Sequence, residues 1–222
     1  MKGIVIGAGQ SLYDENVIDN LVKLKETDDP LLKDVVILAT DRTLKYVLEQ
    51  GIIPEYCGKQ ENLYPATQFG MTDYLPIFFD HDIVKKHASK ITMYVAQALR
   101  WQRHKILSEM GFTMIRFNRY GCGGTLKPAI QTCGHCAMAL LQIARYILKL
   151  DKIAVIGMDM DNSTSWKVYD NTNIAQGMAQ NTIRKTASDF VDTGKPVYNL
   201  TRKGVYHCRG VEETTINEFL KM

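Results

Sequence analysis

The chain of 222 residues lacks several features by which whole classes of protein are recognised. It contains no apolar run approaching the ~20 residues that a membrane-spanning helix needs. Its formal net charge of +3 is too small to indicate a nucleic-acid-binding protein. No signal-peptide core follows Met1, because the sequence turns polar from Gly7 onward. We therefore expect a cytoplasmic protein that binds neither a membrane nor nucleic acid.

The cysteines are odd in number, and their spacing is incomplete for a metal site. Five cysteines, an odd number, do not fit a disulfide framework in a protein without an export signal. Cys133 and Cys136 form a single C-x-x-C pair, with Cys122 and His207 as distant candidate partners. Structural zinc sites usually combine such a pair with further ligands at short spacing. Because the chain has no second pair, we expect no structural zinc here.

Repeats, linkers and low-complexity segments are also absent, and the length suits one domain, residues 1–222, with a substantial core. What the chain does contain is an alternation of short apolar runs with helical patterns. Strands are expected at about 3–7, 35–39, 53–57, 77–79, 91–95, 112–117, 153–156 and 197–200, and helices at about 13–26, 41–50, 82–87, 97–110, 133–150, 172–191 and 212–220. This alternation predicts an α/β protein with a doubly wound, mostly parallel sheet and helices on both faces.

A glycine-bearing loop follows the first expected strand. Gly7 and Gly9 would allow a tight turn and the close approach of a phosphate, and Ser11 suits a helix N-cap. The loop is not a complete G-x-G-x-x-G fingerprint, because Leu12 and Tyr13 follow Ser11. A plain turn between strand and helix therefore stays open as the alternative.

The most informative segment runs from Thr132 to Asp161. It begins with Cys133-Gly-His135, where a helix start would offer backbone N–H groups to an anion. The run Ile153-Ala-Val-Ile156 does not alternate with polar residues, as expected for a strand covered on both faces. Asp159 and Asp161 fall just past its carboxyl end, where open α/β sheets bind their ligands. We expect a nucleotide or anion between this helix start and the glycine loop.

Two roles are open for Asp159. With Asp161 it would form the catalytic pair and hold Mg²⁺, which needs only one or two protein carboxylates. Alternatively, Asp159 anchors its own loop by accepting hydrogen bonds from backbone N–H groups. A ligand role predicts that Asp159→Asn weakens binding by about 1–3 kcal/mol while the fold loses little. An anchoring role predicts the reverse order of effects.

Further polar residues follow the other expected strands. Asp41 is placed either to reach a ribose or base or to cap the next helix. Glu61, Asn62 and Asn118 are either ligand contacts or polar loop residues, and Tyr169 either binds a phosphate or packs. The candidate nucleotide-binding residues are together Gly7, Gly9, Gln10, Ser11, Asp41, Glu61, Asn62, Asn118, Thr132, Cys133, Gly134 and Tyr169.

These motifs, taken in order, resemble those of the MptE-like family, which includes archaeal 6-hydroxymethyl-dihydropterin pyrophosphokinases and the central domain of bacterial motility accessory factors. Gly7-Ala-Gly-Gln-Ser-Leu12 is similar to the family's G-x-G-P-S-L, with Gln10 in place of proline. The stretch from Ala39 to Tyr56 resembles its second block and Thr132–Asp161 its third. Val197–Gly204 is similar to its usual carboxyl end.

The third block also resembles bacterial sialyltransferases that use CMP-sialic acid. Thr132-Cys-Gly134, Gly157-Met-Asp159 and the loop that ends at Tyr169 match the order of motifs in those enzymes. Cys133 replaces their middle serine, and His207 is no secure counterpart of their catalytic histidine. The resemblance implies a nucleotide-binding fold that is Rossmann-like and sialyltransferase-like.

A nucleotide-dependent transferase follows as the expected function. The leading interpretation is glycosyl transfer from a CMP-type sugar nucleotide, and the alternative is a Mg-ATP-dependent 6-hydroxymethyl-dihydropterin pyrophosphokinase. A non-catalytic nucleotide-binding module is the third hypothesis. The expected ligands are a nucleotide or nucleotide sugar, with Mg²⁺ as a further candidate, and an acceptor that the sequence does not identify. The oligomeric state is likewise left open.

Overall fold

The structure is a computed structural model, and it describes residues 1–9, 11–14, 17–26, 29–59, 79, 81–97, 101–119, 129–130, 136–159, 195–201 and 210–222. The strands are β1 Lys2–Ile6, β2 Val35–Thr40, β3 Tyr56–Lys59, β4 Thr92–Ala96, β5 Thr113–Arg119, β6 Ala129–Ile130, β7 Lys152–Ile156, β8 Val197–Asn199 and β9 Val211–Glu213. The α-helices are α1 Ser11–Asp14, α2 Val17–Glu26, α3 Asp41–Glu49, α5 Asp82–His87, α6 Trp101–Glu109, α7 Cys136–Gln142 and α9 Ile216–Lys221. Short 3-10 turns cover Pro30–Leu32 and Ala88–Lys90.

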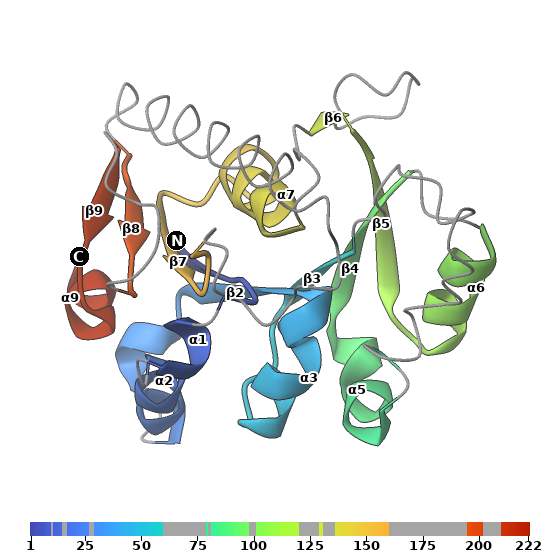
Figure 1. Ribbon diagram of the computed structural model, residues 1–222, viewed down its shortest axis with the longest axis horizontal. Coiled ribbons are helices and arrows are strands. Elements are labelled where there is room, and N and C mark those ends of the chain that lie inside the picture. Colours follow the sequence, from blue (N-terminus) through green and yellow to red (C-terminus); the bar gives the residue numbers. More distant parts are fainter. Residues whose placement is uncertain are drawn as a thin grey trace.

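All nine described strands belong to one parallel sheet, in the order β6-β5-β4-β3-β2-β1-β7-β8-β9 (Figure 1). From β1 the chain adds strands on one side as far as β6. It then returns to the other side of β1 and adds β7, β8 and β9. The direction of winding therefore reverses between β1 and β7, and the expectation of a doubly wound, parallel α/β fold is confirmed.

Helices cover both faces of this sheet. The helix α7 lies over one face, whereas α2, α3, α5 and α9 lie along the other (Figure 1). Side chains alternate between the faces: Val5 and Val155 join the α7 cluster, whereas Ile6 and Ile156 join the cluster with α2 and α9. Among the described residues, no helix has the length and apolar character needed to cross a bilayer.

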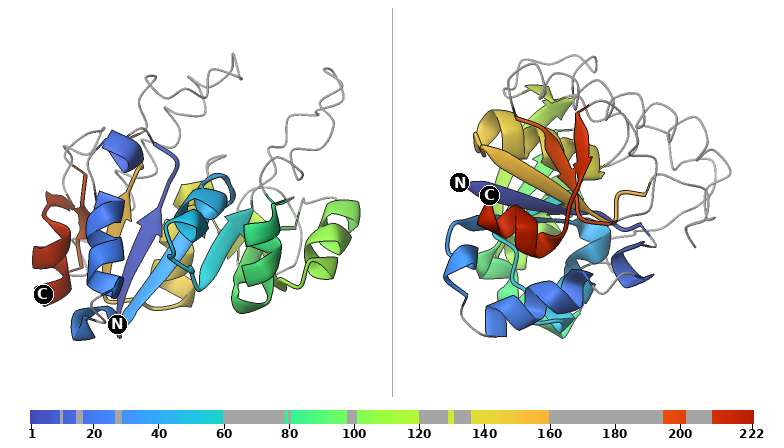
Figure 2. Two further views of the ribbon diagram at one scale, coloured as in Figure 1. Left: turned by 90° about the horizontal axis from the view of Figure 1, so that it is seen from below. Right: turned by 90° about the vertical axis from the view of Figure 1, so that its left-hand side faces the viewer.

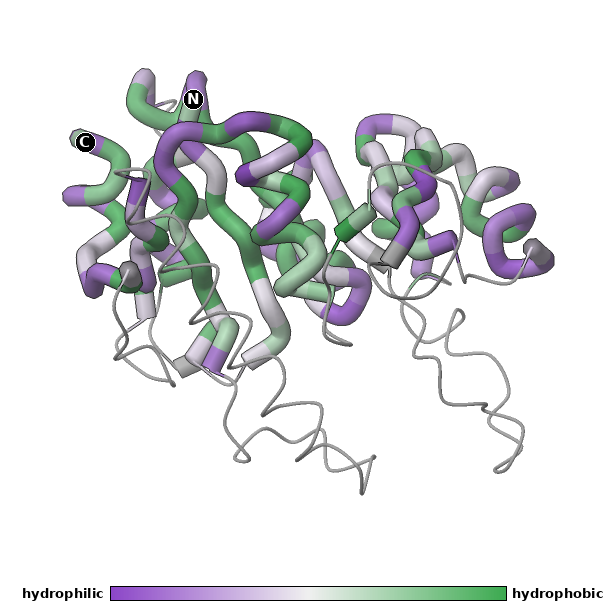
Figure 3. The backbone as a smooth tube through the Cα atoms, turned by 90° about the horizontal axis from the view of Figure 1, so that it is seen from above, coloured by the Kyte–Doolittle hydropathy of each residue, from purple (hydrophilic) through white to green (hydrophobic). Residues whose placement is uncertain are grey.

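The central strands are apolar because both of their faces are covered. Figure 3 shows hydrophobic residues concentrated along the strands and more polar residues along the helices around them. In β1 the four residues Gly3 to Ile6 are all buried. This arrangement explains why these strands carry uninterrupted apolar runs, as parallel strands usually do.

The carboxyl end of the chain differs from the expected helix over 212–220. Val211–Glu213 instead forms β9, which pairs in parallel with β8. The helix α9 begins only at Ile216, because Thr215 caps it: the Thr215 hydroxyl accepts from Glu218 N–H, and the Glu218 carboxylate accepts from Thr215 N–H. This reciprocal capping box stops the helix from extending toward β9.

Other element bounds are corrected as well. The third strand begins at Tyr56 rather than near residue 53, and Phe79, expected in a strand, is helical. The expected four-turn helix is α-helical only over Cys136–Gln142, continues as a π-helix over Ile143–Ile147, and is followed by Lys149 at φ 55°. The short strand β6 was not expected at all, and the helix expected over 172–191 lies outside the described residues.

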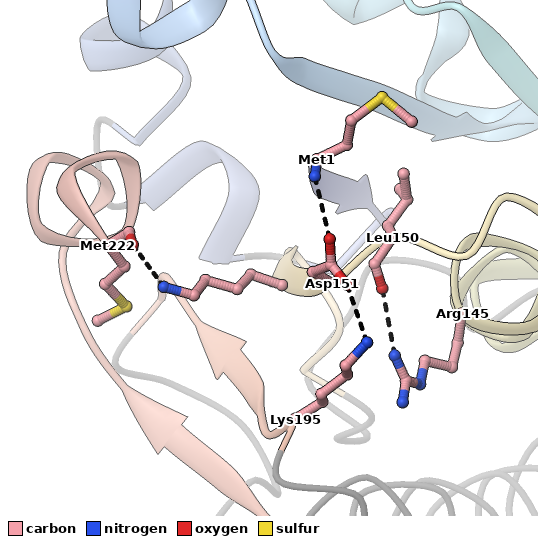
Figure 4. Close-up of polar contacts among 7 residues, drawn as sticks. Met1, Arg145, Leu150, Asp151, Lys195 and Met222 are labelled. Atoms are coloured by element: carbon pink, nitrogen blue, oxygen red, sulfur yellow. Dashed lines mark hydrogen bonds and ion pairs between the residues drawn. The ribbon is translucent and has the colours of Figure 1, made fainter.

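Opposite the carboxyl ends of the strands, a set of exposed polar contacts joins the start of β7 to distant segments (Figure 4). The Asp151 carboxylate accepts from Lys195 Nζ at 2.8 Å and from the Met1 amine at 3.2 Å. Lys195 and then the amine lower the pKa of Asp151. The next residue, Lys152, donates to the Met222 carbonyl oxygen. Exposed ion pairs of this kind contribute little to stability individually.

Candidate functional site at the carboxyl edge

The loops that follow β1 and β7 meet where the winding of the sheet reverses. We call Gly7, Gly9 and Ser11, together with Gly157, Met158 and Asp159, the switch-point loops. Their strands are neighbours, with Ile6 opposite Ile156. Gly7 N–H donates to Ile156 O at 2.8 Å, and Gly9 N–H donates to Gly157 O at 2.6 Å. Open α/β sheets bind their ligands outside the carboxyl ends of the strands at this topological position.

Asp159 holds the two loops together. Its carboxylate accepts from Ser11 N–H at 2.7 Å and also from the Ser11 hydroxyl. Both residues are buried, with Asp159 only 2% exposed. Because Ser11 is the first residue of α1, the carboxylate supplies a negative charge and an acceptor at the start of that helix. The structure therefore gives Asp159 the anchoring role, whereas its ligand role stays a prediction.

The glycines of the switch-point loops are required by the contact between the loops themselves. A Cβ on Gly9 would lie 2.7 Å from the Asp159 carboxylate and 2.7 Å from Gly157 O. A Cβ on Gly7 would lie 2.5 Å from the same carbonyl oxygen. Gly157 has φ +61° and faces Gly7 O, which a Cβ would approach to 2.6 Å. These glycines thus allow the two backbones to touch. From the sequence alone, phosphate binding would have explained the same glycines equally well.

Four backbone donors in and just after the first loop are already engaged. Gly7 and Gly9 donate to the β7 side, Ser11 donates to Asp159, and Leu12 N–H donates to Gly9 O at 3.1 Å. These four amides therefore donate within the protein. Nucleotide contact by Gly7, Gly9 and Ser11 remains a prediction. Such a contact has to involve atoms of the loop other than these engaged N–H groups.

The helix α7 begins at the same edge of the sheet and lies across β1, β2 and β3. Gly58 of β3 pairs with Thr40, one residue beyond the level of Ile6 in β1. A Cβ on Gly58 would lie 2.7 Å from the sulfur of Cys136, the first residue of α7. The start of α7 and the switch-point loops therefore share the carboxyl edge, separated by two strand spacings, or roughly 10 Å.

Asp41 lies next to the switch-point loops, directly after β2, the strand beside β1. It is the first residue of α3, 6% exposed, and its carboxylate accepts from Arg42 N–H at 3.0 Å. The N-cap is Thr40 rather than Asp41, and the Thr40 and Thr43 hydroxyl oxygens are 3.1 Å apart. Asp41 thus lies at the carboxyl edge of the sheet, where a ligand is expected. Its contact with a ribose or base stays a prediction.

Asn118 is separated from this group. It lies within β5 instead of following a strand, opposite Ala129 of β6, and is 7% exposed. Four strand spacings, roughly 19 Å, divide β5 from β1. A single small ligand bound at the switch point would therefore not contact both Asn118 and Asp159.

The remaining candidates lie outside the described residues. They are Gln10, Glu61, Asn62, Thr132, Cys133, Gly134, Asp161 and Tyr169. The single C-x-x-C pair is described only at Cys136, so the expectation of no structural zinc stays a prediction as well.

A buried polar pair that sequence reasoning missed lies at the end of β8. Asn199 is 1% exposed, and its Oδ1 accepts from Thr201 N–H at 3.2 Å and from the Thr201 hydroxyl at 3.0 Å. The sequence signal for this pair was Asn-x-Thr at the end of a short strand. Such a polar pair seldom becomes fully buried without a structural or functional reason.

An aromatic pair borders the loop after β1. The rings of Tyr13 in α1 and Tyr46 in α3 meet edge-on, with centroids 4.9 Å apart. Burial raises the pKa of the Tyr13 hydroxyl, and Tyr46 raises it further. Tyr13, which is partly exposed, therefore stays neutral at physiological pH and able to donate a hydrogen bond.

Comparison with solved structures identifies a similar fold. The structure of MAf glycosyltransferase from Magnetospirillum magneticum AMB-1 matches 96% of this chain with a TM-score of 0.66 and 12% sequence identity. This identity supports a shared fold alone, and the chain spans only 33% of that longer protein. No curated protein matches the sequence.

The family described as "6-hydroxymethylpterin diphosphokinase MptE-like" matches residues 1–165, which is most of the chain. The protein therefore belongs to the MptE-like family.

Proposed function

We propose that the protein is a nucleotide-dependent transferase whose ligand binds at the carboxyl edge, between the switch-point loops and the start of α7. The observation that carries the proposal is the reversal of winding between β1 and β7, where Gly9 and Asp159 hold the two loops in contact. Ligands of open α/β sheets bind at such positions. The family description names a diphosphokinase, and the similar solved structure is a glycosyltransferase. Both descriptions name enzymes that transfer a chemical group.

The leading candidate reaction is glycosyl transfer from a CMP-type sugar nucleotide. The bond between the anomeric carbon and a phosphate oxygen breaks, and an acceptor hydroxyl bonds to that carbon and loses its proton. Negative charge grows on the leaving phosphate and has to be stabilised by donors or by a proton. The start of α7 is one described helix end that suits this purpose, whereas at the start of α1 the N–H of Ser11 already donates to Asp159.

The family description favours a second candidate, Mg-ATP-dependent pyrophosphoryl transfer to the hydroxymethyl group of a pterin. Asp159 would then be one carboxylate ligand of Mg²⁺, which supplies charge neutralisation at the phosphates when bound. Asp159 fits this role by its place just past the carboxyl end of β7, beside the loop after β1. Asp161 is the proposed second ligand.

A nucleotide-binding screen separates these candidates. Binding of CMP, CDP, UDP, GDP, ATP and AMP is measured by thermal shift and calorimetry, each with and without Mg²⁺. Glycosyl transfer predicts that cytidine nucleotides bind without the metal, whereas pyrophosphoryl transfer predicts Mg²⁺-dependent binding of ATP. A ligand that binds without any turnover of CMP-sugars or of ATP with 6-hydroxymethyl-dihydropterin would indicate the third hypothesis, a non-catalytic module. Failure of all six nucleotides to bind would contradict the proposal.

A further inference from the structure

Asn199, at the carboxyl end of β8, has a buried amide nitrogen that lacks a hydrogen-bond partner among the residues that the structure describes. The side chain is 1% exposed, and Nδ2 meets no acceptor in the part of the chain that the structure describes. Buried polar groups are nearly always hydrogen-bonded, because burial removes the bonds to water without replacing them. An unpartnered donor of this kind therefore calls for an explanation.

The orientation of this amide is set by its other end. Thr201 N–H can only donate, so the atom of Asn199 that faces it has to be the carbonyl oxygen. The Thr201 hydroxyl donates to the same oxygen. Rotating the amide by 180° would place its NH₂ against the Thr201 N–H and lose this bond. The unpartnered atom is therefore the NH₂ group, which offers two donors.

The position of Asn199 relates it to the proposed ligand site. Asn199 pairs with Val155 of β7 and lies on the same face as Val197, the face covered by α7. The strand β8 is adjacent to β7 and two strands from β1, so roughly 10 Å separate it from the loop after β1. A nucleotide whose central part lies over the switch-point loops, with its phosphate toward the start of α7, directs its base toward this position.

We propose that Asn199 donates through Nδ2 to a carbonyl oxygen or bare ring nitrogen in the heterocycle of the bound ligand. The proposal rests on the proposed function, because it names the part of the same ligand that β8 contacts. Cytosine, adenine and pterin all carry such acceptors. Because Nδ2 is covered in the structure, the chain around it has to shift when the ligand binds.

The chemistry of the donor favours a heterocycle over a phosphate. Asn199 is neutral, and its described polar partner, Thr201, is neutral too. Phosphates are usually bound by several donors, by cations or by helix ends. A single neutral NH₂ group at the end of a strand is instead suited to donating a hydrogen bond to an uncharged acceptor.

The test compares two Asn199 variants with a matched control. Asn199→Leu keeps the approximate size and removes the amide, and Asn199→Ser keeps an oxygen near Thr201 and also removes the NH₂ group. Val197→Ala is the control, because Val197 is buried on the same face of the same strand and carries no polar group. Calorimetry measures the affinity of each protein for CMP, ATP, 6-hydroxymethylpterin and ribose 5-phosphate.

We expect both Asn199 variants to bind the preferred heterocyclic ligand about tenfold or more weakly, as for the loss of one buried hydrogen bond. Val197→Ala should lose stability and keep its affinity. Equal affinity of the wild-type protein and both Asn199 variants would overturn this inference and leave the proposed function standing. An equal loss for ribose 5-phosphate would overturn the assignment to the heterocycle. If the wild-type protein binds none of the four probes, this inference fails; the proposed function fails with it only if none of the six nucleotides of the binding screen binds either.

Discussion

Replacing Asp159 by asparagine separates the two roles of this residue. The structure shows the Asp159 carboxylate accepting from the Ser11 amide and hydroxyl, across 148 residues of sequence. Asparagine keeps the shape and can still form two neutral hydrogen bonds, one as an acceptor and one as a donor to the hydroxyl oxygen. What the substitution removes is the negative charge that strengthens both contacts and that favours the start of α1.

The expected loss follows from this difference. A hydrogen bond to a charged group contributes about 1.5–3 kcal/mol and a neutral one about 0.5–1.5 kcal/mol, so the variant should lose about 1–3 kcal/mol of unfolding free energy. For a chain of 222 residues this loss corresponds to a decrease in Tm of about 2–12 °C. Ser11→Ala, which removes the hydroxyl and keeps the amide, should cost less.

Urea unfolding of the wild-type protein, Asp159→Asn, Ser11→Ala and the double variant gives the coupling energy between the two side chains. We expect a coupling of about 0.5–3 kcal/mol, as for residues in direct contact. Titration of nucleotide into the same preparations shows whether affinity changes as well. Additive effects on stability, with Asp159→Asn melting like the wild-type protein, would refute the anchoring role.

Three further predictions concern the fold. Gly9→Ala should destabilise the protein by about 1–3 kcal/mol in urea unfolding, because its Cβ would overlap the anchoring carboxylate at 2.7 Å. Gly51→Ala, with open space but φ +76°, should cost only about 1 kcal/mol; equal losses would contradict the argument. The lowered pKa of Asp151 means that its pairing stabilises the fold above the unfolded pKa and that this stabilisation is lost as the pH falls through the folded pKa. Lys195→Met should therefore lower Tm at about pH 7, and this effect should disappear as the pH falls through the folded pKa of Asp151; an effect independent of pH would exclude this pairing. Thr215→Ala should cost about 0.5–2 kcal/mol and unfold α9 first by hydrogen exchange, whereas unchanged protection would contradict the capping box.

The sequence predicted the central strands well, because their burial is visible as uninterrupted apolar runs. Val35–Thr40 was expected with an error of one residue, and Lys152–Ile156 likewise. The helix α3 was also expected, since Asp41 begins it and Gly51, at φ +76°, follows its end. These features are local, so a single sequence carries their signals.

The parts that sequence reasoning missed depend on distant contacts. Val211–Glu213 forms β9 by pairing with β8, although two of its three residues are exposed glutamates. The order of strands, which creates the switch point, leaves no periodic pattern in the chain. The partner of Asp159 is Ser11, and no spacing rule joins the two residues. Sequence reasoning therefore identified both loops and left open whether their glycines and acid serve a ligand or each other.

The most direct test of the account is a crystal structure of the protein with a nucleotide selected by the binding screen. We expect the nucleotide to lie at the carboxyl edge of the sheet, against the switch-point loops and the start of α7, with its base toward Asn199. In Figure 2 this is the edge opposite the two marked chain ends. A nucleotide bound instead at the amino edge near Asp151, or over β4 and β5 away from β1 and β7, would contradict the central claim.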